Sequence, residues 1–310
     1  MYTLVADFGG TNTRLALAHN GQVAPSSLRR YRNADFPGPM QAIRSYLSEQ
    51  ANPAISSACV AAAGPVTQQG VVLTNYPWTL KHTQLAAETG TDRLIFLNDL
   101  QAQGYALHAL KRSDLVPVLD GLDMPGAPRV IVAVGTGVNA AVAHDLNGRL
   151  FVPPSEAGHA AFGAADALDL QIAQAVRAHL GHCPIEGVIS GVGLARLWAF
   201  FGGDQNARGE DVTQAFAAGD PAAIQAVRRF SGYLASHCAD LALGHLARGG
   251  IFLGGSVGNA LAGDLNALGF AEAFRRPGPY QPILREIPVW AVPSGQLTLD
   301  GCAIAAAQGS

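Results

Sequence analysis

The chain carries one short pattern twice: an apolar strand, a glycine turn, an alternating strand and an Asn-Gly pair. The first copy is "VADFGGTNTRLALAHNG" at residues 5–21, and the second is "VIVAVGTGVNAAVAHDLNG" at residues 130–148. Two-residue Asn-Gly loops favour tight β-hairpins because both central residues take positive φ. The repeat therefore predicts a duplicated β-hairpin core, one copy in each of two domains. A chance likeness of two hairpins is the alternative.

The rest of the sequence alternates between strand-like and helical patterns, which predicts an α/β fold. With 310 residues, 49% of them hydrophobic, the chain can bury a large core. The expected strands are residues 2–7, 13–18, 57–62, 71–74, 94–97, 130–134, 250–253 and 287–292. The expected helices are residues 39–47, 82–87, 99–110, most of 163–249, a stretch after the glycines at 254, and a short helix from 300.

The charge of the chain argues against nucleic-acid and membrane partners. Lys and Arg total 20 against 23 Asp and Glu, a net charge of -3, whereas nucleic-acid binding needs a concentrated basic face. Lys81 and Lys111 are the only lysines, so the sequence has no polybasic membrane patch. No apolar run approaches the roughly 18 residues of a membrane span. The N-terminus lacks a signal-peptide pattern, which predicts a cytoplasmic protein.

The cysteines fit the same expectation. Cys59, Cys183, Cys238 and Cys302 are isolated, without a Cys-x-x-Cys pair. A disulfide framework or a cysteine-rich zinc site is therefore not expected. The isolated cysteines fit a protein in a reducing compartment. His179 and Cys183 in "HLGHC" could form a metal pair, but the sequence offers no further ligands at suitable spacing.

Three glycine turns each follow an apolar strand. Bare backbone N–H groups in such turns can bind a polyanion, and three of them predict a shared phosphate site. An ordinary tight turn remains the alternative for any single one. The turns are Phe8–Asn12, Gly135–Val138 and Gly254–Gly258, with Thr11, Asn12 and Thr136 as added neutral donors.

Other phosphate and hydrolase motifs can be tested on the same segments. A Walker loop is excluded because neither lysine follows a glycine. "GTGVNA", residues 135–140, matches a dinucleotide fingerprint with Glu156 downstream, but that fingerprint needs a helix after the turn. A nicotinamide oxidoreductase is thus a distant alternative, decided by whether residues 139–146 form a strand or a helix. "GGSVG" resembles a nucleophile elbow, yet the last histidine, His245, precedes it, so Ser256 is interpreted as a turn or cap residue.

Polar side chains follow two of the apolar strands. Asp7 ends a buried strand, where a charge is costly unless a cation or hydrogen-bond donors meet it. A magnesium or phosphate role is favoured there over a simple turn cap. Asn98 and Asp99 end "RLIFLND" and open a helix. Capping explains one of them, and the other lies where α/β sheets place ligands.

A second polar group lies further along the chain. "PSEAGHAAFG" places Glu156 and His159 three residues apart, and Glu186 precedes "GVISGVGL". Each could be a solvated loop residue. Together with Asn98 and Asp99, they form a set of donors and acceptors suited to a polyhydroxylated ligand.

In order and spacing, these segments resemble those of bacterial glucokinases, hexokinase-type sugar kinases of the actin-like ATPase (ribonuclease H-like) fold. The similar segments run from residue 5 to about residue 257, and the strand near residue 287 continues them, so nearly the whole chain is covered. The cysteine cluster of the family's zinc-bearing relatives is missing. The segments are "DFGGTNTRLAL", "AAAGPV", "TNYPW", "FLNDLQAQG", "VGTGVNAAVAH", "PSEAGHAAF", "IEGVISGVGL" and "GGIFLGGSV".

The resemblance implies two α/β domains around a central cleft: a small domain of residues 1–109 plus about 295–310, and a large domain of residues 110–294. It also implies a homodimer that uses ATP and Mg²⁺ to phosphorylate a hexose, glucose above others, at its 6-hydroxyl. A kinase for another hexose, or a non-catalytic sugar or nucleotide sensor of the same fold, is the alternative. The sensor is disfavoured because Asp99 and the first glycine turn are both present.

The resemblance also implies roles for single residues. Asp99 is the expected catalytic base, and Asp7 is expected to order water around Mg²⁺. The expected sugar ligands are Asn98, Asp99, Glu156, His159 and Glu186. The expected nucleotide-binding residues are Asp7, Gly9, Gly10, Thr11, Asn12, Gly135, Thr136, Gly137, Gly254 and Gly255.

Two positions depart from the family pattern. Asn139 stands where the second loop usually has its last glycine, and Asn tolerates positive φ better than most residues. Ala157 replaces a glycine before Gly-His in the sugar loop. The first departure bears on the fit of the nucleotide, and the second on the shape of the sugar pocket.

Overall fold

The computed structural model describes residues 1–74, 76–293, 295 and 297–309, so Asn75 of "TNYPW" lies outside the described residues. The chain divides into two compact units. The first unit is Met1–Ala109, Asp145–Pro154 and Gly295–Ser310, and the second is Leu110–His144 and Ser155–Ser294. Relative to the expected domains, residues 145–154 lie with the first unit rather than the second.

The first unit is built on a mixed sheet with the strand order β3-β2-β1-β5-β9, and β4 pairs with the first half of β2. β1 and β2 are antiparallel, whereas β1, β5 and β9 are parallel neighbours. The strands are β1 (Tyr2–Phe8), β2 (Asn12–His19), β3 (Gln22–Val23), β4 (Arg29–Arg32), β5 (Ile55–Ala62) and β9 (Leu94–Asn98).

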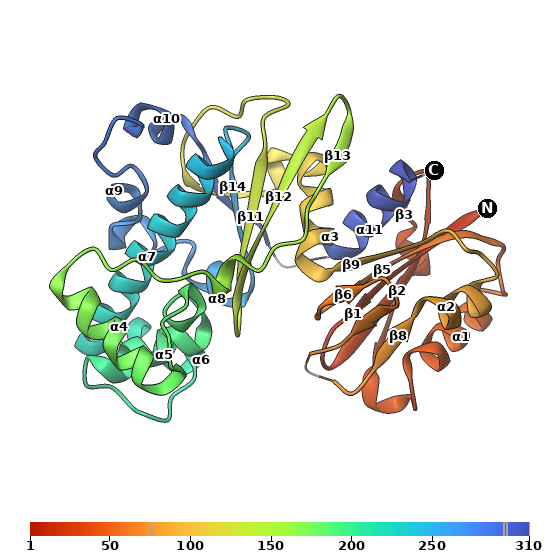
Figure 1. Cartoon of the computed structure of the whole chain (residues 1–310), viewed down its shortest axis with the longest axis horizontal. Helices are drawn as coiled ribbons and strands as arrows, with labels where there is room; N and C mark the ends of the chain where they lie inside the picture. The colour runs from red at the N-terminus through yellow and green to blue at the C-terminus, as the bar shows by residue number, and fades with distance from the viewer. Residues whose placement is uncertain (75, 294, 296, 310) are drawn as a thin grey trace. The chain divides into compact units, whose positions relative to one another are not determined.

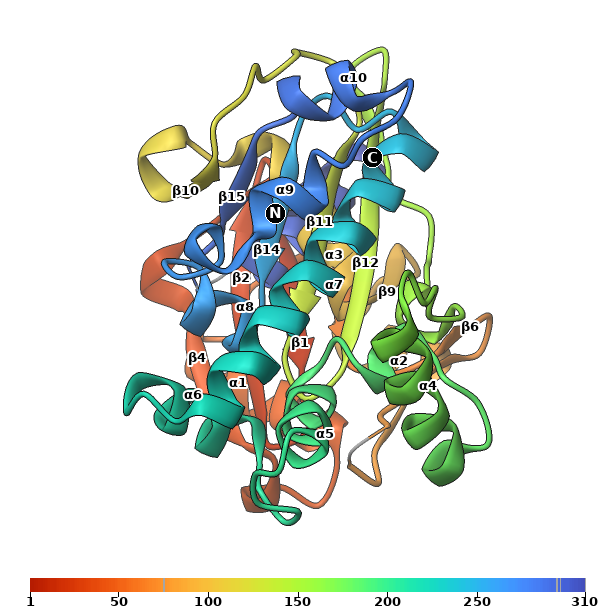
Figure 2. The same ribbon diagram turned by 90° about the vertical axis from the view of Figure 1, so that its left-hand side faces the viewer.

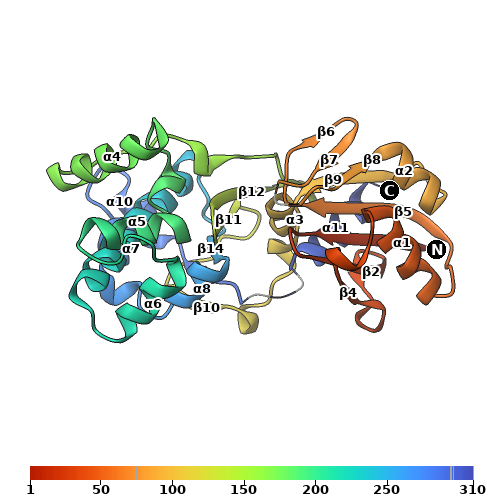
Figure 3. The same ribbon diagram turned by 90° about the horizontal axis from the view of Figure 1, so that it is seen from below.

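Helices cover both faces of this sheet (Figure 1). Because successive strand residues point to opposite faces, Leu4 and Phe8 of β1 pack with α1 and α2, while Val5 packs with α3 and α11. A small sheet, β6-β7-β8, lies beside β9 (Figure 3). These elements are α1 (Pro39–Glu49), α2 (His82–Thr89), α3 (Asp99–Ala106), α11 (Leu297–Gln308), β6 (Val66–Thr67), β7 (Gly70–Val72) and β8 (Thr79–Lys81).

The second unit holds a sheet with the order β10-β15-β14-β11-β12. β12 runs on into the first unit, where it turns at Asn147 and Gly148 and pairs with β13 (Arg149–Phe151). The long helix α7 packs across β11 and β14 (Figure 2) and buries Phe230 and Leu234 in the common core. The elements are β10 (Val116–Leu119), β11 (Arg129–Val134), β12 (Val138–Leu146), β14 (Ile251–Gly254), β15 (Val289–Ala291) and α7 (Pro221–His245).

Shorter helices complete the second unit, and the chain between residues 163 and 249 is helical as predicted. They are α4 (Ala167–Leu180), α5 (Gly191–Phe200), α6 (Gly209–Ala217), α8 (Ser256–Leu261), α9 (Phe270–Phe274) and α10 (Gln281–Glu286). No helix of the described part of the chain is long and apolar enough to cross a membrane.

The duplicated hairpin is confirmed. The order β2-β1-β5-β9 in the first unit matches β12-β11-β14-β15 in the second, with the same parallel and antiparallel neighbours. Asn20 and Gly21 have φ of 49° and 75°, and Asn147 and Gly148 have 60° and 85°, as tight hairpin turns require. Residues 138–146 form a strand rather than a helix, so the dinucleotide fingerprint lacks its helix and the nicotinamide alternative fails.

Element ends differ from the expectations by a few residues. The α-helix expected over 99–110 ends at Ala106 and continues as a 3₁₀ turn, Leu107–Ala109. The last helix begins at Leu297 instead of Asp300. Thr298 and Leu299 are buried in the first unit, so tertiary packing extends the helix over residues whose local pattern does not mark a helix start.

Candidate active site

The first glycine turn, between β1 and β2, is held by a buried asparagine. Asn33 Nδ2 donates to Gly9 O at 2.8 Å, and Asn33 Oδ1 accepts from Thr13 Oγ1 at 2.9 Å. Gly9 N donates to Asn12 O at 3.0 Å, and a Cβ on Gly9 would lie only 3.2 Å from that oxygen. A side chain at position 9 would therefore fit only if the turn shifted by a few tenths of an ångström. Asn33 follows a charged, surface-like run of residues, so its local sequence does not mark it as part of a site.

Asp7 has a cationic partner that was not among the predicted site residues. It lies opposite Arg14 in the β1–β2 register, and Arg14 Nε donates to Asp7 Oδ2 at 2.9 Å while Nη2 contacts the same oxygen. Burial raises the pKa of Asp7, and the charge and hydrogen bonds of Arg14 act in the opposite direction. Arg14 is thus the cation that this buried carboxylate requires. The signal was the single basic residue in an otherwise apolar alternating strand.

Asn98 and Asp99 lie at the same edge of the sheet as the first glycine turn. Phe8, Ala62 and Asn98 are aligned across the parallel strands β1, β5 and β9. Asn98 caps α3, since its Oδ1 accepts from Gln101 N at 2.6 Å. Asp99 is the first residue of α3, and its Oδ1 accepts from Leu100 N at 2.9 Å. Capping therefore explains Asn98, and the carboxylate of Asp99 stands beside that cap.

The second glycine turn and the glycines after β14 share an edge of the other sheet, because Ala133 is aligned with Gly254. A Cβ on Gly255, where φ is 83°, would lie 2.3 Å from Val134 O, so that position requires glycine. A Cβ on Gly135 would meet only Ser256 Oγ at 3.8 Å, an ordinary contact. The packing of the unit therefore does not account for the glycine at 135.

Glu186 is bound to the second turn. Its Oε2 accepts from Val138 N at 3.1 Å, and a Cβ on Gly137 would lie 2.3 Å from the same oxygen. Glu186 is half-buried in a 3₁₀ turn, Ile185–Gly187. The carboxylate thus occupies the space that Gly137 leaves open.

The segment with Glu156 and His159 lies beside the Glu186 segment. Ile185 N donates to Ala160 O at 2.8 Å, and Ala161 pairs with Pro184 in an isolated β-bridge. Glu156 and His159 are exposed, and Ala157–His159 form a 3₁₀ turn. The structure therefore brings the three candidate sugar ligands of the second unit onto two neighbouring turns.

The two departures from the family pattern lie next to each other in this group. Asn139 lies in β12, opposite Ala133, and makes no use of its tolerance for positive φ. Its side chain contacts the loop of Glu156 instead, and Asn139 Oδ1 accepts from Ala157 N at 2.9 Å. Ala157 fits this loop with a half-buried side chain.

The predicted residues thus form two groups, one in each unit. The first unit joins Asp7, the first glycine turn, Asn98 and Asp99 at one sheet edge. The second unit joins the second glycine turn, the Gly254–Gly255 turn, Glu156, His159 and Glu186. Ser256 begins α8 directly after Gly255, consistent with a turn residue. No group of three or more potential metal ligands occurs among the described residues, those around His179 and Cys183 included.

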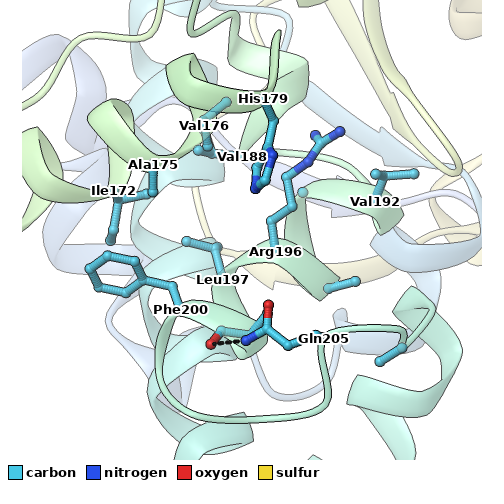
Figure 4. A pocket seen from close by; sticks show the side chains of 14 residues that line it. Ile172, Ala175, Val176, His179, Val188, Val192, Arg196, Leu197, Phe200 and Gln205 are labelled. Carbon is cyan, nitrogen blue, oxygen red and sulfur yellow. Dashed lines mark hydrogen bonds between the residues drawn. The ribbon is translucent and has the colours of Figure 1, made fainter.

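A cavity of about 410 Å³ lies between α4 and α5 of the second unit (Figure 4). Its lining is largely apolar, with His179, Arg196 and Gln205 as polar members. None of the predicted site residues lines it. Helix α5 nevertheless connects the two places, because its first residue, Gly191, donates from N to Gly135 O at 2.7 Å.

Comparisons with known proteins agree with this arrangement. The glucokinase family matches residues 4–309. A glucokinase of Tolumonas auensis is 31% identical over 306 residues, which cover 96% of this chain and 94% of that protein. The crystal structure of a glucokinase from an Antarctic psychrotroph has a TM-score of 0.88 at 28% identity and covers 98% of both chains.

A more distant structure shows the fold alone. A ROK family glucokinase of Streptomyces griseus, solved in complex with glucose and AMPPNP, is 18% identical with a TM-score of 0.64 and covers 98% of both chains. The two matching sheets and the solved relatives together show the α/β, actin-like ATPase fold. With nearly its whole length matched, the chain belongs to the glucokinase family.

Proposed function

We propose that this chain transfers the γ-phosphoryl group of ATP to the 6-hydroxyl of glucose, with Asp99 as the general base. The observation that carries the proposal is the position of Asp99 on the first unit's sheet edge. It lies on the same sheet edge as the first glycine turn, with β5 between the two strands, and the side-chain cap of α3 comes from Asn98. Family membership supports the reaction class, and the position of Asp99 supports its role.

Phosphoryl transfer needs mainly positioning and charge neutralisation from the protein. Asp99 accepts the proton of the sugar 6-hydroxyl as the hydroxyl oxygen attacks the γ-phosphorus in line and the bond to ADP breaks. Asn98 holds the start of α3 in place through its cap, which fixes the carboxylate next to it. A positioned general base typically contributes about 10²–10⁴-fold to the rate.

We assign the phosphates to the glycine turns of both units. Gly135 supports this assignment. A Cβ at this position would not clash with the rest of the unit, so the packing of the chain does not explain the glycine, whereas close approach of a phosphate would. Gly9 N and Gly135 N donate within their own turns, to Asn12 O and Gly137 O. The backbone N–H groups of Gly10–Asn12 and Thr136–Gly137, with the hydroxyls of Thr11 and Thr136, therefore donate to phosphate oxygens. Gly254 and Gly255 lie on the same sheet edge as the second turn, and we place the adenosine beside them.

Mg²⁺ fits this site as a companion of the nucleotide. The described residues offer no cage of protein ligands, and Mg²⁺ commonly keeps several waters and binds through one or two carboxylates and substrate phosphates. Both contacts from Arg14 reach Oδ2 of Asp7, so we assign Oδ1 to a metal-bound water. When bound, the ion supplies positive charge to the β- and γ-phosphates.

Glucose hydroxyls are assigned to Glu156, His159 and Glu186 from the second unit and to Asn98 and Asp99 from the first. A polar group that the bound sugar covers but leaves without a hydroxyl partner costs about 1–3 kcal/mol, or roughly tenfold to a hundredfold in affinity. An epimer that misplaces one hydroxyl is therefore rejected by these residues. A homodimer is the assembly that the family resemblance implies, and light scattering on the purified protein measures it.

A panel assay tests the function. ADP release with Mg-ATP is measured with glucose, mannose, fructose and N-acetylglucosamine, and Asp99→Asn serves as the inactive control. Glucose should give the highest kcat/KM. Binding of glucose without turnover of any sugar would favour the sugar sensor over the kinase.

A further inference from the structure

Asn139 holds the loop of Glu156 through both ends of its side-chain amide. Its Nδ2 donates to Ser155 O at 2.7 Å and to Glu156 Oε2 at 3.3 Å. Its Oδ1 accepts from Ala157 N at 2.9 Å and from Ala140 N at 2.8 Å. One side chain of β12 therefore contacts three consecutive residues of the loop.

The neighbouring residue of β12 holds the second carboxylate. Val138 N donates to Glu186 Oε2, and Gly158 packs so closely on Val138 that a Cβ there would lie 1.9 Å from its carbonyl oxygen. Adjacent residues of one strand thus bind Glu156 and Glu186. The strand β12 begins at Val138, directly after the second glycine turn.

Glu156 needs such a partner because it is exposed and precedes a short 3₁₀ turn. An exposed glutamate samples several rotamers, and fixing one costs conformational entropy each time a ligand binds. The amide of Asn139 meets one carboxylate oxygen and two backbone groups of the loop, so it prepares the orientation in advance. A glycine, which the family pattern has at this position, has no side chain that could do so.

We infer that Asn139 is a positioning residue for sugar binding: it orients the carboxylate of Glu156 and ties the sugar loop to β12. The inference rests on the proposed function, since it takes Glu156 as a sugar ligand. The replacement of the family's glycine by Asn139 is therefore expected to affect sugar binding rather than the fit of the nucleotide. A loss of Asn139 should therefore weaken sugar binding far more than ATP binding.

Asn139→Gly is the first test. Glucose Kd by titration calorimetry and glucose KM should both rise about three- to tenfold, the loss expected for the hydrogen bonds removed. The KM for ATP and kcat at saturating glucose should stay within about twofold. Asn206→Gly, an exposed loop position of the same unit, is the matched control and should change neither constant.

Asn139→Asp is the second test, because it keeps the shape of the side chain and replaces the donor with an acceptor. The new carboxylate would face Glu156 Oε2 and the carbonyl of Ser155, with Glu186 and His159 on the adjoining turns. Two carboxylates in contact share a proton more readily, so the pKa of one of them rises. Glucose affinity should be low at pH 8 and recover toward pH 5, a dependence that Asn139→Gly should lack.

The outcomes separate the two proposals. Two results would overturn the role of Asn139, provided that both variants keep the wild-type melting temperature. One is an equal loss of affinity for glucose and for ATP, and the other is an unchanged glucose affinity in both variants. A wild-type protein that binds glucose without phosphorylating it would overturn the kinase function alone, and calorimetry would still test Asn139. A wild-type protein that neither binds nor phosphorylates any sugar would overturn both.

Discussion

The two hairpins of this chain have the same backbone plan but opposite chemistry at one position. Just before the glycine turn, the first hairpin pairs Asp7 with Arg14, and the second pairs Ala133 with Asn139. The first pair is charged, and its two side chains form an ion pair with each other. In the second, alanine offers no side-chain partner, and the amide of Asn139 contacts the loop of Glu156 instead. The same position of the two hairpins thus makes a charged pair in one unit and neutral hydrogen bonds to a loop in the other.

The charged pair thus lies in the first hairpin, and the second hairpin has neutral hydrogen bonds at the same position. The largest effect is expected for Asp99→Asn, which removes the proposed base from the sheet edge of the first unit. We expect kcat to fall about 10²–10⁴-fold with glucose affinity near normal, because the amide keeps the shape but cannot accept the proton. Steady-state kinetics and calorimetry measure the two effects.

Asp92→Asn is the matched control, an exposed aspartate two residues before β9, and it should leave kcat unchanged. If Asp99→Asn kept more than about a tenth of the wild-type rate, the base would have to be sought elsewhere.

Arg14→Met breaks the charged pair directly and leaves Asp7 buried without its cation. We expect a loss of about 1–3 kcal/mol in the free energy of unfolding at pH 8, since the uncompensated group bears its desolvation cost. Arg44→Met, which removes an exposed partner of Glu88, should cost clearly less, because water screens an exposed ion pair. Urea unfolding compares the two variants.

The loss in Arg14→Met should depend on pH. Burial already raises the pKa of Asp7 in the folded protein, and without Arg14 it rises further. The folded state then holds a proton that the unfolded state releases, so stability is recovered as pH falls through the raised pKa and is lost as pH increases through it. An equal loss at pH 8 and pH 5 would show that Asp7 does not carry the effect.

The smallest effects are expected from alanine substitutions in the second glycine turn. Gly135→Ala should leave the melting temperature unchanged, because the new methyl meets only Ser256 Oγ at an ordinary distance. The KM for ATP should rise severalfold if a phosphate approaches this backbone. Gly137→Ala, whose methyl meets Glu186 Oε2, should raise the KM for glucose in addition. An unchanged KM for glucose in Gly137→Ala would contradict the role of Glu186 as a sugar ligand.

Much of the architecture was predictable from local signals. The Asn-Gly turns, the apolar strands and the helical spacing in residues 163–249 each act within a few residues, and all are confirmed. The early start of α11 was missed because it depends on burial against the rest of the first unit. Arg14 and Asn33 were missed because their partners are chosen by register and by the approach of β4.

Local sequence patterns predicted the duplicated hairpins and the α/β class, which the structure confirms, and they singled out the candidate site residues. The partners of these residues depend on the tertiary structure: Asp7 meets Arg14, Glu186 meets Val138, and Asn139 meets the loop of Glu156. The reason is physical. Turn and strand preferences are local, whereas a hydrogen bond between residues far apart in the chain exists only once strand register and packing have brought its two atoms together.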